Sequence, residues 1–317
     1  MQETSFSLPE TDDGVVVQGY RWLPEPEVAA PVRATVQVAH GLAEHCARYR
    51  RMAEGLTARG FAVYASDHRG HGRTGAEGAA RGFFAERDGW GRVLEDLARV
   101  GDLVAREQPG VPRVLFGHSM GSYLAQQVLF ERGEEFAGAV LSGSSSGVSN
   151  PLAPIGRVVA RAERWRVGPK KPSALLTKLS FGEFNKAFEP ARTAYDWLSR
   201  DPAEVDRYIA DPWCGFEAST QLWVDLLNAL PGLALPENLA RVPRAMPLYV
   251  VSGERDPIHS KLKGFRMLVD AYRDHGMLRV YDKLYQGARH ELLNETHRDE
   301  VTRDLAAWIE EAVLGAR

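Results

Sequence analysis

A serine at the centre of a Gly-x-Ser-x-Gly pattern is the residue of this chain with the clearest chemical potential. Ser119 stands between Gly117 and Gly121, after the apolar residues 114–116 and before residues 123–129, whose apolar positions have helical spacing. A strand that enters a helix through so tight a turn leaves no room for side chains beside the turn residue, which explains the two glycines. The turn holds the serine in a strained conformation with its hydroxyl exposed. The pattern therefore predicts that Ser119 is a nucleophile.

A serine hydroxyl needs a histidine as base and a carboxylate that orients the imidazole. On a strand–turn–helix elbow the acid and then the histidine follow the serine along the chain, so the base is expected after the apolar strand at 247–251. Four histidines satisfy this condition: His259, His275, His290 and His297. We predict that His290 is the base, because it comes just after the last predicted strand, where a loop can reach over the strand ends. The other three fit better in the loop of the acid, at a helix end and near the start of the last helix.

The acid is expected at the carboxyl end of the strand at 247–251, where open α/β sheets bind their ligands. Asp256 follows this strand after a short loop and precedes a proline, so we predict that it is the acid. Glu254 and Asp282 are the alternatives. Glu254 lies too near the strand end and Asp282 lies within a strand, so both are more typical of structural residues.

An acyl-transfer site also needs N–H groups that stabilise the oxyanion of the tetrahedral intermediate. One donor is the backbone N–H of the residue after the nucleophile, here Met120. The second comes from the loop after an earlier buried strand. His40–Gly41 follows such a strand, and we predict that the Leu42 N–H is this donor.

The elements that must position these residues alternate between buried strands and helices over most of the chain. A hairpin is expected at 4–8 and 14–22, followed by parallel strands whose apolar runs are typical of a sheet covered on both faces. The alternation stops in the middle of the chain, where helix-like pieces are separated by prolines. We predict an α/β fold with a mostly parallel central sheet and an inserted helical cap. The predicted division is core (1–149), cap (150–235) and core (236–317).

Composition excludes several other classes of protein. The 317 residues carry a formal charge of -3 and are 44% hydrophobic and 26% charged, as expected of a soluble globular protein and not of a nucleic-acid-binding domain. The cysteines, Cys46 and Cys214, lie far apart without the spacing of a metal site, which fits a reducing compartment. Neither a signal peptide nor a membrane span is recognised. We expect a cytoplasmic protein.

Taken together, the segments that surround these residues resemble the monoacylglycerol lipase and lysophospholipase family of α/β-hydrolases. The similar segments are spread in order along the core: 40–45 with Arg48 and Tyr49, 67–72, 117–121, the Asp256 loop and 287–291. The resemblance implies an α/β-hydrolase fold, a triad of Ser119, Asp256 and His290, and oxyanion donors at Leu42 and Met120. It also implies that Glu44 and Arg48 border the pocket for the head group of the substrate. No metal or organic cofactor is expected.

The predicted cap has two further features. Residues 181–230 contain nine aromatic residues, more than a short helical cap buries internally, so some of them are expected to line an acyl-chain cleft. Residues 151–180 contain seven Lys or Arg and one Glu, interleaved with apolar residues. A solvated helix face is one interpretation of this segment, and peripheral contact with an anionic lipid surface is the other.

The function predicted from the sequence is hydrolysis of the carboxylic ester of a lipid with a single acyl chain, a monoacylglycerol or a lysophospholipid, through an acyl-enzyme. A general carboxylesterase or an aminopeptidase-like hydrolase on the same scaffold is the first alternative. A binding protein that keeps the fold without turnover is the second, and the presence of Ser119, Asp256 and His290 argues against it.

Overall fold

The computed structural model describes residues 1–28, 31–75, 80–148 and 152–315, and within them the chain forms one eight-stranded sheet. The second strand, β2, pairs antiparallel with both of its neighbours, β1 and β4, and the six strands from β3 to β8 are parallel to one another. The order across the sheet is β1 (Gln2–Ser7), β2 (Gln18–Leu23), β4 (Phe61–Ser66), β3 (Ala34–Ala39), β5 (Arg113–His118), β6 (Gly138–Ser142), β7 (Leu248–Gly253) and β8 (Val280–Tyr285).

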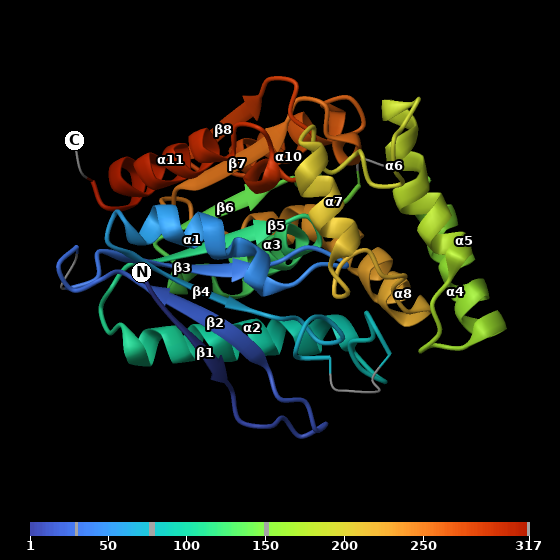
Figure 1. The fold of residues 1–317 in the computed structure, drawn as a ribbon, viewed down its shortest axis with the longest axis horizontal. Helices are drawn as coiled ribbons and strands as arrows, with labels where there is room; N and C mark the ends of the chain where they lie inside the picture. The colour runs from blue at the N-terminus through green and yellow to red at the C-terminus, as the bar shows by residue number, and fades with distance from the viewer. Residues whose placement is uncertain (29–30, 76–79, 149–151, 316–317) are drawn as a thin grey trace.

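Helices cover both faces of this sheet, as the continuous apolar runs of β3–β7 require. Side chains of α2, α3 and α10 form one hydrophobic cluster against the sheet, and side chains of α1 and α11 form the other. Figure 1 shows the long helix α2 along one side of the sheet and α1 with α11 along the other. The bounds of these helices are α1 (Arg50–Thr57), α2 (Gly89–Glu107), α3 (Met120–Arg132), α10 (Lys263–Asp274) and α11 (Arg298–Trp308).

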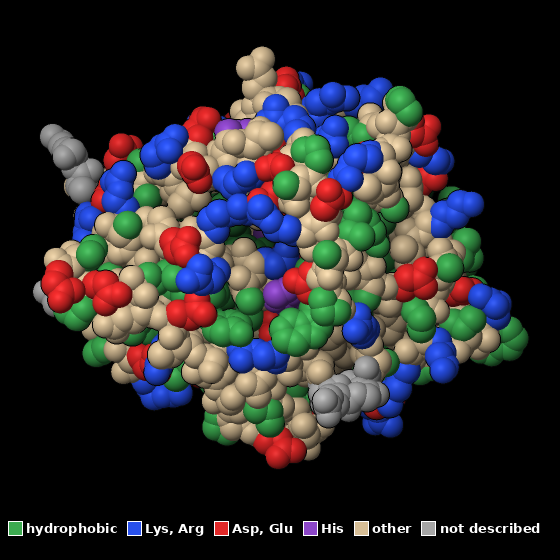
Figure 2. All heavy atoms as spheres, viewed as in Figure 1, with side chains coloured by type: hydrophobic (Ala, Val, Ile, Leu, Met, Phe, Trp, Pro, Cys, Tyr) green, Lys and Arg blue, Asp and Glu red, His purple; other side chains and the backbone are tan. Residues whose placement is uncertain are grey.

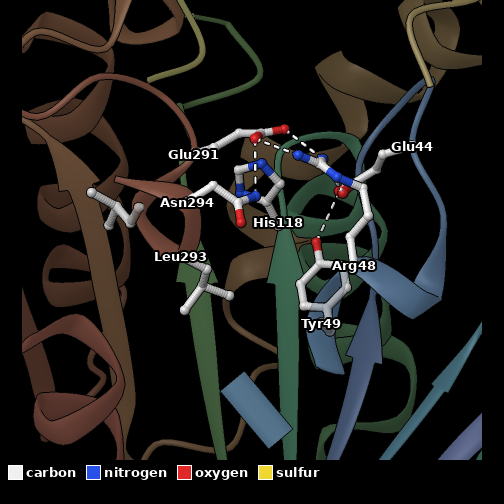
Figure 3. Close-up of a pocket in the computed structure, with 8 residues that line it drawn as sticks. Glu44, Arg48, Tyr49, His118, Glu291, Leu293 and Asn294 are labelled. Atoms are coloured by element: carbon white, nitrogen blue, oxygen red, sulfur yellow. Dashed lines mark hydrogen bonds and ion pairs between the residues drawn. The ribbon is translucent and has the colours of Figure 1, made fainter. Parts of the chain in front are cut away.

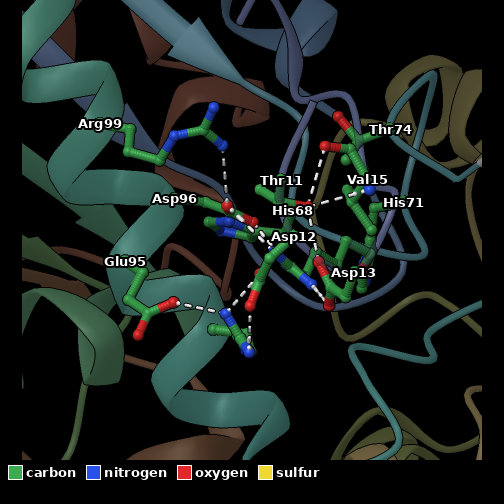
Figure 4. A network of polar contacts seen from close by, with 12 residues as sticks. Thr11, Asp12, Asp13, Val15, His68, His71, Thr74, Glu95, Asp96 and Arg99 are labelled. Carbon is green, nitrogen blue, oxygen red and sulfur yellow. Dashed lines mark hydrogen bonds and ion pairs between the residues drawn. The ribbon is translucent and has the colours of Figure 1, made fainter. Parts of the chain in front are cut away.

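The predicted N-terminal hairpin is present, but its second strand begins at Gln18 and not at residue 14. The connection between β1 and β2 is instead a loop tied to α2 by ion pairs (Figure 4). Arg69 contacts both Asp96 of α2, at 2.6 Å, and Asp13 of this loop. The backbone N–H groups of Val15 and Gln18 donate to the hydroxyls of Thr11 and Thr74, both at 2.9 Å, so side chains take the place of strand partners there.

Between β6 and β7 the described residues form helices and loops, without a strand. The helices are α4 (Ala153–Val167), α5 (Ala174–Thr177), α6 (Glu183–Asn185), α7 (Pro202–Ala210), α8 (Thr220–Ala229) and α9 (Pro236–Leu239). In Figure 1, α4–α8 gather at one end of the sheet, and both chain termini lie away from them. We call residues 150–235 the cap segment. Its division from the core at 149/150 lies outside the described residues and stays a prediction.

Across the described ranges, we find no helix with both the length and the apolar character needed to cross a lipid bilayer.

Candidate active site

The turn between β5 and α3 holds Ser119 in a conformation that few residues adopt. Its backbone has φ 52° and ψ −121°, and its side chain is partly exposed. A Cβ on Gly121 would lie 2.0 Å from the Ala39 carbonyl oxygen, and one on Gly117 would lie 2.5 Å from the Gly121 oxygen. Only glycine fits at either position. The two glycines let the turn approach β3 closely. A turn of this kind presents the Ser119 hydroxyl above the carboxyl ends of the strands.

His290 and Asp256 meet at these strand ends, although 34 residues separate them in the sequence. The distance from His290 Nδ1 to Asp256 Oδ2 is 2.9 Å, and both side chains are buried. Asp256 also accepts hydrogen bonds from the Ile258 N–H, at 3.0 Å, and the Ser252 hydroxyl, at 3.1 Å. The carboxylate is thus fixed on three sides, and it orients the imidazole through one ring nitrogen.

The imidazole of His290 lies between two other rings. Its centroid is 4.8 Å from the ring of His118, the residue before Ser119, and 5.0 Å from the ring of Trp197 in the cap segment. A Cβ on Gly143 would lie 2.9 Å from His290 Cε1, and the preceding Ser142 accepts a hydrogen bond from the Ser119 N–H at 3.0 Å. These contacts bring His290 and Ser119 to the same spot. Within the described residues the Ser119 hydroxyl makes no hydrogen bond to the imidazole, a contact that often tightens only when substrate binds.

Electrostatics at this spot favour a charged pair of acid and base. Burial opposes charge on His290, but the Asp256 carboxylate outweighs it, and the pKa of His290 is raised above its ordinary value. Burial likewise opposes charge on Asp256, but His290 and the hydrogen bonds to the carboxylate lower the pKa of Asp256 to about 2. His118 behaves oppositely, because burial and the neighbouring His290 lower its pKa to about 4. The structure thus keeps the ring of His118 neutral beside that of His290.

Two backbone N–H groups next to residues of the serine turn have no partner within the described residues: Leu42 follows Gly41, where a Cβ would lie 3.2 Å from Ser119 Cβ, and Met120 follows Ser119 itself. In the described part of the chain, neither the Leu42 N–H nor the Met120 N–H donates a hydrogen bond to another residue, and Met120 is the first residue of α3. Ala43, next to Leu42, has a φ of 57°, and its carbonyl accepts hydrogen bonds from the Tyr208 hydroxyl at 2.9 Å and the Gly215 N–H at 3.0 Å. The cap segment therefore holds the strained loop that carries Leu42.

Glu44 and Arg48 form a buried ion cluster with a third residue, Glu291 (Figure 3). Arg48 donates to both Glu291 oxygens at 2.7 Å and to Glu44 at 2.8 Å. Glu44 also accepts from the Gly41 N–H at 2.6 Å and from the Tyr49 hydroxyl at 2.9 Å. The cluster borders a small pocket, but its charged groups bind one another. Its contact with substrate stays a prediction.

The polar segment 67–72 packs against the start of the loop that follows β3. The backbone N–H of His68 donates to His40 Nε2 at 2.9 Å, and the ring centroids of the two histidines are 4.0 Å apart. We therefore assign His68 no role in substrate binding. Burial lowers the pKa of His68 to about 3 and that of His71 to about 4. These neutral histidines lie under the strand ends and position the loop that follows β3.

The alternatives considered for the base and the acid have other partners. His259 is buried against the Gly253 carbonyl at 2.8 Å, His275 contacts the Ala271 carbonyl at 2.7 Å, and His297 contacts Arg200 at 2.8 Å. Glu254 accepts from the Gly287 N–H at 2.9 Å, and Asp282 pairs with Arg273. Neither of these carboxylates contacts a histidine in the described residues.

Glu291 and Tyr208 were not identified from the sequence. Glu291 directly follows the predicted base, but its pairing with Arg48 joins residues 243 positions apart. Tyr208 is one of several aromatic residues in the cap segment, and nothing in its sequence neighbourhood marks its contact with Ala43.

Comparison with known proteins assigns the family. A family model described as "Serine aminopeptidase, S33" matches residues 30–297, most of the chain. The chain belongs to this family. Within this hydrolase family it is similar to the monoacylglycerol lipase of Mycolicibacterium smegmatis, with 31% identity over 91% of this chain and 90% of that protein. It is also similar to the monoglyceride lipase of Mus musculus, with 28% identity over 90% of this chain and 84% of that protein.

Solved structures of esterases and lipases share the fold of this chain. A thermostable carboxyl esterase from Bacillus coagulans, solved in complex with glycerol, superposes with a TM-score of 0.88 at 26% identity over 99% of both chains. The predicted α/β-hydrolase fold is confirmed, and so is the resemblance to the monoacylglycerol lipase group of carboxylic ester hydrolases.

Proposed function

We propose that this member of the hydrolase family is a lipase that cleaves the ester of a lipid with a single acyl chain, using Ser119 as nucleophile. His290 removes the proton from the Ser119 hydroxyl as it attacks the ester carbonyl, and Asp256 stabilises the imidazolium that forms. The N–H groups of Leu42 and Met120 stabilise the oxyanion. His290 then gives the proton to the leaving alcohol, and water activated by the same imidazole releases the fatty acid.

One observation carries this proposal: the imidazole of His290, held by Asp256 at 2.9 Å, lies at the strained serine turn beside two unpartnered N–H groups. The lipid character of the substrate is supported by an aromatic cluster at the same imidazole. The Phe181 ring stacks on Trp197 at 5.6 Å and meets Trp223 edge-on at 5.8 Å. Rings of this kind suit an acyl chain. Glu44 and Arg48, beside the pocket of Figure 3, are proposed to border the head group.

Labelling with a fluorophosphonate probe tests the nucleophile. The wild-type protein is expected to be labelled, and the Ser119→Ala variant is expected to lose labelling completely. Ser180→Ala, which removes a hydroxyl from a helix of the cap segment, is the matched control and should label like wild type. Labelling of Ser119→Ala at the wild-type rate would contradict the proposal, and absence of labelling in wild type would favour the binding-protein alternative.

A substrate panel tests the class of ester. Monoacylglycerols and lysophospholipids of graded chain length are compared with a short aryl ester and a peptide anilide. We expect the highest kcat/KM on a single-chain lipid. A higher value on the short aryl ester would indicate a general carboxylesterase, and a higher value on the anilide would indicate an aminopeptidase.

We also propose that residues 151–180 rest on an anionic lipid surface, apart from Pro151, which lies outside the described residues. On α4, Ile155 is 61% exposed, Val158 is 66% exposed and Trp165 is 88% exposed. Their spacing places them on one face of the helix. Where Figure 1 places α4 and α5, Figure 2 shows hydrophobic and basic side chains interleaved at the surface. A helix with exposed apolar and basic groups binds the interface of an anionic bilayer.

Flotation with phosphatidylglycerol and with phosphatidylcholine vesicles tests this contact. Wild type is expected to float with the anionic vesicles at low salt and less at high salt. The double variant Val158→Gln, Trp165→Gln should lose binding. Leu278→Gln, which replaces a 77% exposed leucine far along the chain, is the control and should bind like wild type. If wild type stays unbound to anionic vesicles at low salt, the proposed contact is wrong.

A further inference from the structure

Three side chains with metal-binding atoms meet where the cap segment contacts the loop after β3. His45 lies in that loop, whereas Asp211 and Cys214 follow α7. One potential ligand atom from each lies within 4.8 Å of those of the other two. The distance from His45 Nε2 to Asp211 Oδ2 is 2.8 Å. The sequence separates His45 from the other two by more than 160 positions, so no spacing pattern marks the cluster.

The groups in this cluster are not satisfied by the protein alone. His45 is 6% exposed, and its Nδ1 has no hydrogen-bond partner within the described residues. Because a carboxylate only accepts hydrogen bonds, the contact with Asp211 places the proton on Nε2 and leaves a lone pair on Nδ1. Cys214 is buried and forms no disulfide. A buried ring nitrogen without a partner beside a free thiol calls for an explanation, because buried polar groups are nearly always hydrogen-bonded.

The chemistry of the three donors fits one class of ligand. Imidazole nitrogen, thiolate sulfur and carboxylate oxygen are the ligands of zinc, and three protein ligands with a water molecule complete a tetrahedral site. Harder ions such as Mg²⁺ and Ca²⁺ suit this set less well, since they prefer oxygen ligands to thiolate sulfur.

The charge of the surroundings also accommodates a cation. Arg48 is a positive charge that acts on Cys214 and Asp211 and opposes a metal ion. Glu44 and Glu291 both pair with Arg48, so this cluster is negative by one charge. Asp211 adds a second negative charge, and a divalent ion would balance the two.

We propose that His45, Asp211 and Cys214 bind a divalent transition metal ion of the zinc type, which joins the cap segment to the loop that carries Leu42. The ion displaces the proton that lies between His45 Nε2 and Asp211 Oδ2, and this proton passes to the free Nδ1; the ion then bonds to Nε2, to the carboxylate oxygen and to the Cys214 sulfur. The thiol proton leaves to solvent, and water fills the remaining position. The ion takes no part in ester cleavage, because Ser119 and His290 are not among its ligands.

Titration of the metal-free full chain with Zn²⁺ tests the site by calorimetry. We expect one Zn²⁺ per chain. The measured binding enthalpy should vary linearly with the ionisation heat of the buffer, which reports the release of a proton. Cys214→Ala and His45→Gln are each expected to weaken binding by more than about tenfold. Cys46→Ala, which removes the other buried cysteine, is the matched control and should bind Zn²⁺ like wild type.

Titration with Co²⁺ gives an independent readout of the ligands. The wild-type complex is expected to show a sulfur-to-cobalt charge-transfer band that Cys46→Ala keeps and Cys214→Ala loses. Asp211→Asn serves if Cys214→Ala does not fold, and it should weaken Co²⁺ binding while keeping the band. Absence of stoichiometric Zn²⁺ binding in wild type, or a charge-transfer band that survives Cys214→Ala, would overturn the proposal.

Discussion

The imidazole of His290 sets the pH range in which the proposed mechanism works. Asp256 raises the pKa of His290 above its ordinary value of 6.5, so the protonated ring persists to higher pH than in a free histidine. Only the deprotonated ring accepts the Ser119 proton. We therefore expect kcat/KM on a monoacylglycerol to fall as the pH is lowered through a value above 6.5, as measured in a pH–rate profile.

The variant Asp256→Asn serves as the control for this assignment. Removing the carboxylate charge removes the cause of the raised pKa, so the residual activity should persist to lower pH than in wild type. The rate itself is expected to fall by about 10⁴, as when the acid of another serine triad is changed to the amide. An unchanged acid limb in Asp256→Asn would show that a group other than His290 controls it.

A substitution at Arg48 distinguishes a structural role of the buried ion cluster from a role in substrate binding. Its side chain is 12% exposed, and those of Glu44 and Glu291 are 5% and 7% exposed. Changing Arg48 to Met leaves two buried carboxylates without their partner, which is expected to lower the free energy of unfolding by about 3–5 kcal/mol. Urea denaturation measures this loss.

Arg50→Met is the matched control for this experiment. Arg50 also pairs with two carboxylates, of Glu3 and Glu54, but its side chain is 57% exposed, so water screens the pairs. Its change should alter the free energy of unfolding by less than about 1 kcal/mol. If Arg48→Met instead raises KM and leaves stability unchanged, the residue acts on substrate and not on the fold.

At the scale of elements, the contact between α7 and the loop after β3 couples the cap segment to the proposed oxyanion site. The Tyr208 hydroxyl, on α7, donates to the Ala43 carbonyl at 2.9 Å. Ala43 is held at a positive φ that a non-glycine residue rarely adopts, and this strain persists only where the surroundings fix it. Loss of this hydrogen bond should leave the position of the Leu42 N–H less fixed. This N–H is proposed to stabilise the oxyanion, which develops in the transition state.

We expect Tyr208→Phe to lower kcat by about tenfold with KM nearly unchanged, because the interaction lost is one made in the transition state. Steady-state kinetics on a monoacylglycerol measures both constants. Tyr64→Phe is the control, since its hydroxyl donates to Glu107 at 3.0 Å, away from the strand ends. A rise in KM without a change in kcat would contradict the positioning role of Tyr208.

Elements with uniform apolar patterns could be predicted from the sequence, and elements fixed by distant contacts could not. The strands at 34–39 and 61–66 are apolar at most positions and fully buried, which is the pattern expected of parallel strands covered on both faces. The second strand of the hairpin was predicted at 14–22 but begins at Gln18. Residues 8–17 include types that are common in strands, but they form the loop between β1 and β2, in which Asp13 pairs with Arg69.

The candidate site divides in the same way. Ser119 could be predicted because its pattern of glycines directly follows an apolar strand, and His290 because it comes just after the last strand. The roles assigned to them and to Asp256 stay predictions until the variants are measured. Glu291 and Tyr208 could not be found, since their importance depends on the partners Arg48 and Ala43, which lie far away in the sequence.

At the scale of the whole molecule, the cap segment is anchored to the core by more than the loop after β3. The backbone N–H groups of His290 and Glu291 donate to the Trp197 and Leu198 carbonyls at 3.3 Å and 2.8 Å. Arg200 pairs with the buried Glu295 at 2.9 Å. The loop that carries the proposed base is therefore held in place by hydrogen bonds that it donates to the cap segment. The site needs both the cap segment and the core.

This shared anchoring predicts that the cap segment and the sheet unfold together. If residues 197–200 separated from the core, the N–H groups of His290 and Glu291 would lose their carbonyl partners, and Glu295 would lose its ion pair with Arg200. Because these contacts would all be lost together, we expect one cooperative transition. Calorimetry should give equal calorimetric and van't Hoff enthalpies, and tryptophan fluorescence and far-ultraviolet circular dichroism should share one midpoint. Two separated transitions, with the tryptophan signal changing first, would show that the helical segment is a lid that opens independently of the core.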